Sequence, residues 1–293
     1  MTGTSLRRLF ASPVFWRGVA SIVAFLVLWE LGARSRQWMA PEFYAPFKEL
    51  LVAMGFKKDY LPWIGAVPAP SAVLKSWLAV IGQAGYWQSW YMSFFRVMAG
   101  FVSAMLIGIP FGLALAVSRS AHGIGFPVFE VLRPIPPLAW VPASIIFWPT
   151  QELAISFVTF LGAFYTIVIN VLGGARSIDM RYFQAAQSMG ASRLDIFRRI
   201  ILPGTLPSIV VGSAVGMGIT WEVVVAAEMI SGGGSQIGGT SGGGLGFFIW
   251  NSYVGGSYEQ IVVGMISIGV AGYVSSELLR WLGYYVTPWL RVR

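Results

Sequence analysis

The chain has 293 residues and a net charge of +8; 56% of its residues are hydrophobic and only 11% are charged. A soluble domain carries about 25% charged residues, so this composition predicts an integral membrane protein. The absence of cysteine and the single histidine, His122, exclude disulfides, thiolate zinc sites, iron–sulfur clusters and cysteine nucleophiles. The positive charge is better explained by arginines that flank membrane spans than by nucleic-acid binding.

Six apolar stretches are long enough to cross a bilayer, which takes about 20 residues. They lie near residues 16–33, 95–117, 125–148, 152–174, 206–229 and 259–281. We expect helices, because the backbone must satisfy its own hydrogen bonds in hydrocarbon and the stretches do not alternate as barrel strands do. Two shorter stretches, 45–55 and 72–92, contain charged or amide side chains and predict outer amphipathic helices. The sequence thus predicts an all-α membrane protein of about six spans.

Arginines indicate the orientation of these spans. With the N-terminus inside, the short cytoplasmic loops collect most of the arginines, whereas all four lysines fall in the first, longer outer segment. Short loops follow the positive-inside rule most closely, so both termini are expected in the cytoplasm. The first span resembles a signal peptide, but no small-residue cleavage site follows it, which favours an uncleaved span.

The sequence contains no phosphate-binding loop of its own. That motif needs a Gly-Lys pair, and the chain has none. ATP, if it is used, must therefore be bound by another chain. The glycine-rich run 231–244 has no lysine and is predicted to be a flexible or re-entrant outer turn. The roles of this run and of residues 34–66 are left open.

The segment 181–203, between the fourth and fifth spans, is predicted to form two short cytoplasmic helices. Gly190 can end the first in a left-handed conformation, and Ser192 with Asp195 resembles a capping box that opens the second. Pro203 and Pro207 are expected to close the second helix before the next span.

Small side chains give this segment a surface that another protein can approach closely, formed by Ala185, Ala186 and Gly190. A polar face is expected from Arg193, Arg198 and Arg199. An ordinary basic loop would account for the arginines alone.

The spacing of Ala185-Ala186, Gly190 and Leu202-Pro203 resembles the EAA loop of ABC-transporter permease subunits. In that family the loop is the coupling helix that docks on the ATPase subunit. Gln184 stands where the family usually has glutamate, so a contact that needs a carboxylate is not expected at this position. The resemblance assigns coupling to Gln184, Ala185, Ala186, Gly190, Leu202 and Pro203.

Further blocks resemble permeases of the nitrate/sulfonate/bicarbonate (nitrate–taurine) family and cover roughly residues 67–290. They are Val67 to Leu74, Ser93 to Phe101, Leu132 to Trp140, Ala226 to Met229 and Gly244 to Asn251. The last two look nearest to the nitrate and bicarbonate branch.

This resemblance implies a type I ABC importer permease fold, with an N-terminal helix and outer segment at 1–92 and a core at 93–293. It implies a multi-pass subunit of the bacterial cytoplasmic membrane, paired with a second copy or a paralogue. Two cytoplasmic ATPase subunits would bind ATP and Mg, and an external binding protein, separate or fused, would deliver a small solute. An anion such as nitrate, bicarbonate or a sulfonate is expected, moved by alternating access. No catalytic residue, metal site or cofactor is expected in this chain.

Ionisable residues within spans are candidates for the transport pathway. Glu130 and Arg133 are three residues apart and can pair on one helix face, and the prolines after Arg133 predict a kinked or unwound third span. The candidate pathway or gate residues are Arg96, Arg133, Pro136, Pro137, Trp140, Glu222 and Glu228. The two glutamates oppose an anion unless they are protonated, paired with a residue such as Arg96, or turned away; otherwise the solute is neutral or cationic.

Two other classes of protein remain possible from the composition. An ATP-independent secondary transporter or channel would explain the spans but not the spacing within 181–203. A membrane-embedded enzyme is disfavoured by the shortage of histidine, cysteine and clustered acidic residues.

Overall fold

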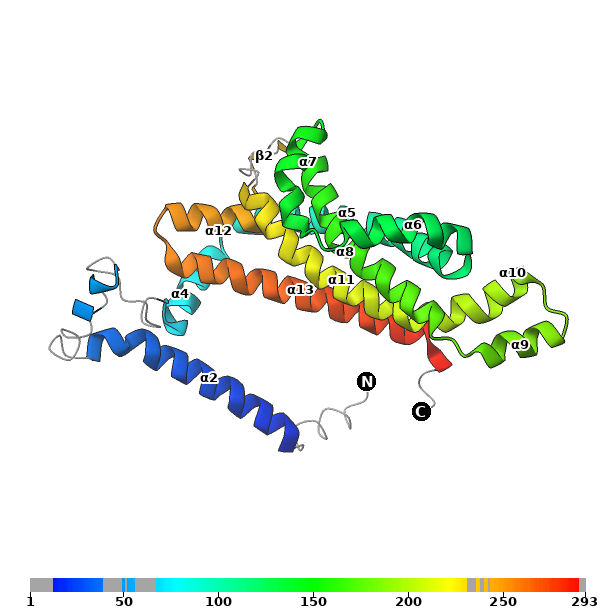
Figure 1. Ribbon diagram of the computed structural model, residues 1–293. Helices are drawn as coiled ribbons and strands as arrows, with labels where there is room; N and C mark the ends of the chain where they lie inside the picture. The colour runs from blue at the N-terminus through cyan, green and yellow to red at the C-terminus, as the bar shows by residue number, and fades with distance from the viewer. Residues whose placement is uncertain are drawn as a thin grey trace. The chain divides into compact units, whose positions relative to one another are not determined.

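The computed structural model describes residues 13–38, 49–50, 52–55, 67–230, 236–237, 240–241 and 243–289. These residues form helices joined by short connections, plus one pair of two-residue strands (Figure 1). The chain divides into two compact units, which are described separately. The first comprises Met1–Gly82 and Gly255–Val263, and the second Gln83–Val254 and Gly264–Arg293.

The first unit contains α2 (Pro13–Trp38) and α4 (Pro70–Val80). Pro70 suits the first position of a helix because its missing N–H has no helical partner there. The two helices are joined by the carboxylate of Glu30, which accepts hydrogen bonds from the Ser71 backbone N–H at 3.0 Å and the Ser71 hydroxyl at 2.8 Å. Arg34 pairs with the same carboxylate at 2.6 Å. Of the helix predicted over 45–55, residues 45–48 and 51 lie outside the described residues, whereas 49–50 and 52–53 are helical.

Within the described ranges, five helical segments are long and apolar enough to cross a membrane. They are Phe15–Arg34, Ala84–Val117, Gln151–Arg176, Arg193–Ile230 and Tyr258–Val286. Five of the six predicted spans fall within these segments, which confirms an all-helical membrane fold.

The core of the second unit is formed by α5 (Ala84–Val117), α8 (Gln151–Arg176) and α11 (Leu202–Ile230). Val97, Val158, Ile167 and Val224 are fully buried in it. Small residues let the helix backbones approach closely, as in other membrane bundles. At Gly100 of α5, an added Cβ would overlap the Thr159 side chain and the backbone of α8.

The predicted third span, 125–148, is wrong as a single helix. The chain instead forms α6 (Arg119–Leu132), a 3₁₀ turn η2 (Pro137–Trp140) and α7 (Val141–Phe147). Prolines at positions 134, 136 and 137 have no N–H to donate, so the helix cannot continue through them. The expected interruption in this span is therefore confirmed, and it is a complete break.

Two other predicted boundaries are wrong. The stretch 72–92 is not one short helix, because α4 ends at Val80 and residues 84–92 already belong to the 34-residue helix α5. Pro203 and Pro207 do not close the helix that starts at Arg193. The chain passes through a π-helical turn, η3 (Phe197–Ile201), straight into α11. In this turn the Leu202 N–H donates to the Phe197 carbonyl, so the change of hydrogen-bond register falls just before Pro203.

The opposite end of α11 leads into β1 (Gln236–Ile237) and β2 (Thr240–Ser241), which pair antiparallel, and then into α12 (Gly244–Val254) and α13 (Tyr258–Val286). Residues 231–235, part of the predicted glycine-rich turn, lie outside the described residues. Within the second unit, α9 (Met180–Ser188) and α10 (Arg193–Ile196) project as a hairpin at the end away from α12 (Figure 1).

Candidate functional site

The hairpin of α9 and α10 begins at Asp179. The Asp179 side chain caps α9 by accepting a hydrogen bond from the Arg181 backbone N–H at 2.9 Å, and it also pairs with the Arg181 guanidinium at 2.7 Å. The Arg181 side chain, followed by its backbone N–H, lowers the pKa of Asp179 below its ordinary value. The carboxylate therefore stays charged at neutral pH, where it complements the positive N-terminal end of α9.

Gly190 ends α9, as the sequence predicts. Its φ of +78° lies in the left-handed region that favours glycine. The Gly190 N–H donates to the Gln187 carbonyl at 2.9 Å and the Ala191 N–H to the Ala186 carbonyl at 3.0 Å, which is the hydrogen-bond pattern of a Schellman motif. This motif reverses the chain within a few residues and fixes the angle at which α10 leaves.

The predicted capping box of α10 is also confirmed. The Asp195 N–H donates to the Ser192 hydroxyl at 3.2 Å, and the Ser192 N–H donates to the Asp195 carboxylate at 3.2 Å. The helix start is thus fixed by two reciprocal bonds.

The hairpin has a buried side and an exposed side. Ala186 and Ile196 are buried in the core, whereas Gln184, Ala185 and Gly190 are exposed. Four large apolar side chains on the hairpin are also exposed, namely Met180, Tyr182, Met189 and Leu194. The three arginines predicted to form a polar face, Arg193, Arg198 and Arg199, are exposed as well. Apolar side chains mixed with cations on a projecting hairpin are typical of a surface that binds another protein.

Leu202 and Pro203 do not lie on this surface. They form the half-buried first turn of α11, where the hairpin joins the long helix. Arg193–Ile230 is one continuous helical segment of 38 residues, which corresponds to about 57 Å at 1.5 Å per residue. A displacement of the hairpin can therefore be carried along the whole of α11.

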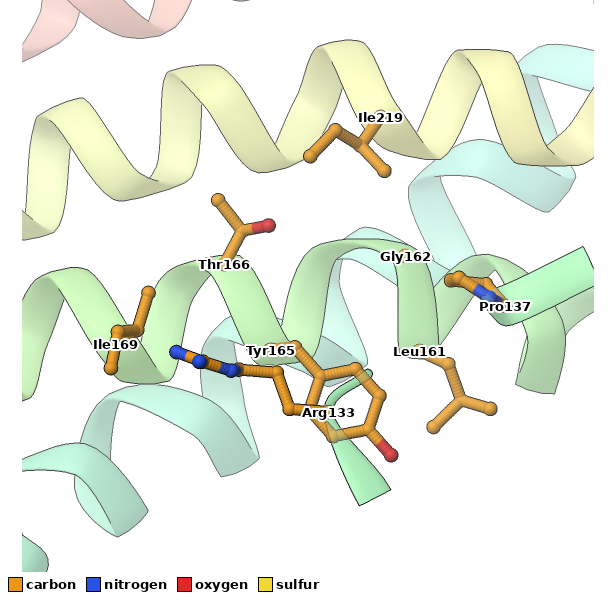
Figure 2. A pocket seen from close by; sticks show the side chains of 8 residues that line it. All are labelled: Arg133, Pro137, Leu161, Gly162, Tyr165, Thr166, Ile169 and Ile219. Carbon is orange, nitrogen blue, oxygen red and sulfur yellow. The ribbon is translucent and has the colours of Figure 1, made fainter. Parts of the chain in front are cut away.

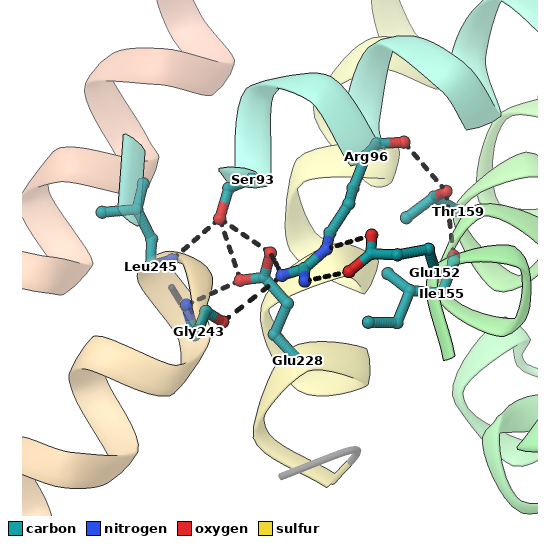
Figure 3. A network of polar contacts seen from close by, with 9 residues as sticks. Ser93, Arg96, Glu152, Ile155, Thr159, Glu228, Gly243 and Leu245 are labelled. Atoms are coloured by element: carbon teal, nitrogen blue, oxygen red, sulfur yellow. Dashed lines mark hydrogen bonds and ion pairs between the residues drawn. The ribbon is translucent and has the colours of Figure 1, made fainter. Parts of the chain in front are cut away.

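Arg96 occupies the centre of a buried polar network at the other end of these helices (Figure 3). Its side chain is 1% exposed. The guanidinium Nη1 donates to Glu228 at 2.8 Å, and Nε and Nη2 donate to the two oxygens of Glu152 at 2.8 and 2.5 Å. Ser93 donates to the Glu228 carboxylate at 2.8 and 2.9 Å. The network joins α5, α8 and α11.

The start of α12 completes this network. The Gly246 N–H donates to Glu228 at 2.9 Å, the Leu245 N–H donates to the Ser93 hydroxyl at 2.8 Å, and the Gly243 carbonyl accepts from Arg96 at 3.3 Å. Gly244 has a φ of +79°, and a Cβ there would overlap the Glu228 carboxylate. Backbone N–H groups at a helix start favour an anion, so Glu228 is held by both a cation and a helix end.

The sequence left three alternatives for Glu228, which could be protonated, paired with a residue such as Arg96, or turned away. In the structure it is paired with Arg96. Glu152 is the member that the sequence reasoning missed. Its position in the first turn of α8 was visible, but its partner lies 56 residues away, and no local spacing connects the two.

Arg133 lines a separate cavity of about 270 Å³ between the helix break and α8 (Figure 2). It lies at the C-cap of α6 and pairs with Glu130 at 2.9 Å, which confirms the predicted pair. The remaining lining residues are Pro137, Leu161, Gly162, Tyr165, Thr166, Ile169 and Ile219. In Figure 2, Thr166 points from α8 toward α11, and Ile219 points from α11 toward α8.

The other candidate residues are distributed as follows. Pro136 and Trp140 lie beside this cavity on the broken segment, and Trp140 packs edge-on against Phe157. Glu222 is exposed on the same face of α11 as Val211 and Val215. The structure thus places Arg133 and Pro137 together, keeps Arg96 and Glu228 in the other network, and leaves Glu222 outside both. Among the described residues, no group of three metal-ligating side chains is present.

Comparisons with known proteins identify the family of this chain. The family model for the binding-protein-dependent transport system inner membrane component matches residues 108–292. The nitrate import permease protein NrtB of Leptolyngbya laminosa is 35% identical over 70% of this chain and 70% of its own. The taurine transport system permease protein TauC of Escherichia coli (strain K12) is 32% identical over 76% of this chain and 80% of its own.

One solved structure shares the fold. A bacterial ABC transporter involved in the import of the acidic polysaccharide alginate has a chain that superimposes with a TM-score of 0.55 at 15% identity, covering 92% of this chain and 99% of that one. The match to the family model and the identity to these relatives lead to one conclusion: this chain belongs to the family of inner membrane components of binding-protein-dependent transport systems.

Proposed function

We propose that this chain is the permease subunit of an ATP-driven importer and that the α9–α10 hairpin is its contact with a cytoplasmic ATPase. The observation that carries the proposal is the hairpin itself: a reversal fixed at Gly190, with apolar and cationic side chains exposed on its outer side. The chain has no Gly-Lys pair and so no phosphate-binding loop, which means that the energy of ATP must enter through a partner.

The proposed assembly contains two copies of this permease, or one copy and a paralogue, with two ATPase subunits and an outer binding protein. The four hairpin arginines, Arg181, Arg193, Arg198 and Arg199, favour a cytoplasmic hairpin and hence cytoplasmic termini. Residues 93–293 would supply the pathway and the coupling loop, and residues 1–92 an additional helix and outer segment.

The proposed mechanism uses α11 as the moving element. Closure of the ATPases would draw the hairpins together, and the continuous helix Arg193–Ile230 would carry that motion to the network around Glu228. Opening and closing of the two ends in alternation would move the solute without any covalent chemistry in this chain. The broken segment 133–140 would form part of the pathway wall, because non-helical backbone in a membrane is tolerated where it lines a cavity.

The proposed solute is a small anion such as nitrate, bicarbonate or a sulfonate. Support comes from the names of the relatives, which specify nitrate and taurine, the latter a sulfonate.

The test is ATP hydrolysis by the complex reconstituted in liposomes with its ATPase subunits and its binding protein. Gly190→Asp should abolish solute-stimulated hydrolysis, because a charged side chain would stand in the docking surface. The left-handed backbone would cost only about 1–2 kcal/mol, so the subunit should still insert. Gly123→Asp, at another exposed glycine with open space around it, is the control and should keep stimulation. Normal stimulation in Gly190→Asp, or solute uptake without ATP, would refute the proposal.

A further inference from the structure

The cavity at the helix break combines a mostly apolar lining with a positive charge. Among the described residues that line it, Arg133 is the one with a charged side chain, and Tyr165 and Thr166 contribute hydroxyl groups. The other lining residues are apolar. Its volume of about 270 Å³ falls just below the range of about 300–1,000 Å³ for drug-sized ligands, so it suits a smaller solute.

The guanidinium of Arg133 has donors to spare. Arginine carries five N–H donors, and Arg133 donates from Nη2 to Glu130 Oε1 at 2.9 Å. The planar fork of arginine matches the geometry of carboxylate and phosphate oxygens. Nitrate and bicarbonate are planar oxyanions like a carboxylate, and a sulfonate is tetrahedral like a phosphate, so each can take the same fork.

The cavity also lies where the helical backbone is interrupted. Arg133 is the C-cap of α6, directly before the proline-rich break, and Pro137 opens the 3₁₀ turn beyond it. Transport proteins form solute sites at discontinuous helices of this kind, where the chain leaves the helix near the membrane midplane. Arg133 can therefore move with the break while α8, which supplies most of the remaining wall, stays in the packed core.

We infer that this cavity is a transient site for the translocated solute, and that Arg133 binds it as a small monovalent oxyanion. The inference rests on the proposed function and adds the site and the chemical basis of its selectivity. Tyr165 and Thr166 also line the cavity, but in Figure 2 the Tyr165 hydroxyl points away from the Arg133 guanidinium and Thr166 points toward α11, so Arg133 is the contact on which the inference rests.

Glu130 gives this site a means of release. Its carboxylate holds the Arg133 guanidinium in the empty state and competes with the solute for it. An incoming anion must displace one carboxylate contact, and the return of Glu130 helps to expel the anion. The anion is thus bound weakly enough to leave, which a translocation site requires.

The test uses the reconstituted complex and measures uptake of labelled nitrate, bicarbonate and taurine together with ATP hydrolysis. Arg133→Gln should lower the amount of anion moved per ATP by about tenfold or more, because bonds to a charged donor are lost. ATP hydrolysis and the half-saturating concentration set by the binding protein should change little. Arg280→Gln is the matched control, since Arg280 also pairs with a glutamate three residues before it, Glu277, at 2.7 Å, but lines no part of this cavity.

A second experiment measures nitrate binding to the complex without binding protein, by equilibrium dialysis and ion chromatography. In this experiment a substitution of Glu130 should change the affinity for nitrate in the opposite direction to a substitution of Arg133. Glu130→Gln should bind nitrate more tightly than wild type, and Arg133→Gln should not bind it measurably. Equal transport stoichiometry in Arg133→Gln and Arg280→Gln overturns the inference while leaving the permease function standing. If Arg133→Gln fails to assemble, unchanged or weaker nitrate binding in Glu130→Gln overturns it. A wild-type complex that hydrolyses ATP but moves none of the three solutes overturns the proposed solute class and this site with it.

Discussion

Arg96 is the residue whose removal should cost the fold most. Replacing it with methionine keeps much of the side-chain volume but removes the cation that faces Glu228, which is 0% exposed. Breaking a buried ion pair from one side costs about 3–5 kcal/mol, because the remaining charge has no partner. This is a large fraction of a typical total stability of about 5–15 kcal/mol. The Ser93 and Gly246 donors remain, so we expect the lower half of that range.

The assay is equilibrium unfolding of the purified chain in mixed micelles, followed by the fluorescence of its 13 tryptophans. Arg280→Met is the control, because its pair with Glu277 is 58% and 42% exposed and should contribute only about 0–1 kcal/mol. The double variant Arg96→Met with Glu228→Gln should be more stable than Arg96→Met alone, since the fully buried charge of Glu228 is removed, although the part-exposed Glu152 also loses its arginine. The reasoning would be refuted if Arg96→Met and Arg280→Met lowered the free energy of unfolding equally. It would also be refuted if the effects of Arg96→Met and Glu228→Gln added in the double variant.

Three further substitutions test other parts of the structure. Gly100→Ala should destabilise the chain by about 1–3 kcal/mol in the same unfolding assay, because the new methyl overlaps Thr159; an unchanged midpoint would contradict this packing. Asp179→Ala should increase proteolysis of the hairpin at pH 7. Because the folded-state pKa of Asp179 is lowered, its stabilisation is full above the ordinary pKa and is lost as pH falls through the lowered one. The difference from wild type should therefore vanish only at a pH below the ordinary pKa of an aspartate. Glu222→Gln should change the rate of uptake more than Glu228→Gln among correctly assembled complexes, because Glu222 is exposed on its span; the reverse ranking would count against it.

The local features of the hairpin could be predicted from sequence because they depend on neighbouring residues. A glycine that ends a helix and a Ser192–Asp195 capping box need only a few consecutive positions, and both are confirmed. The long spans could be predicted for a similar reason, since their length and apolar composition are properties of continuous stretches.

The remaining features depend on relations that one sequence does not display. The proline cluster indicated an interruption at 133–137, but not that it would divide the span into three pieces. Pro203 suggested a helix end, whereas the π-helical turn before it lets the helix continue. The partner of Arg96 on α8 lies 56 residues along the chain, and only the packing of α5 on α8 brings the two together. Sequence reasoning thus offered Arg96 as a partner for Glu228, which the structure shows, but it missed Glu152.

The position of the hairpin tip is the measurement that tests the account most directly. The chain has no cysteine, so Met189→Cys places a single thiol on the exposed tip, where Met189 is 81% exposed. In right-side-out membrane vesicles that contain the assembled complex, this thiol should cross-link to the ATPase subunit and should resist an impermeant maleimide added outside. Labelling from outside, or cytoplasmic labelling with no cross-link to any ATPase, would contradict the claim that the hairpin couples this subunit to its energy source.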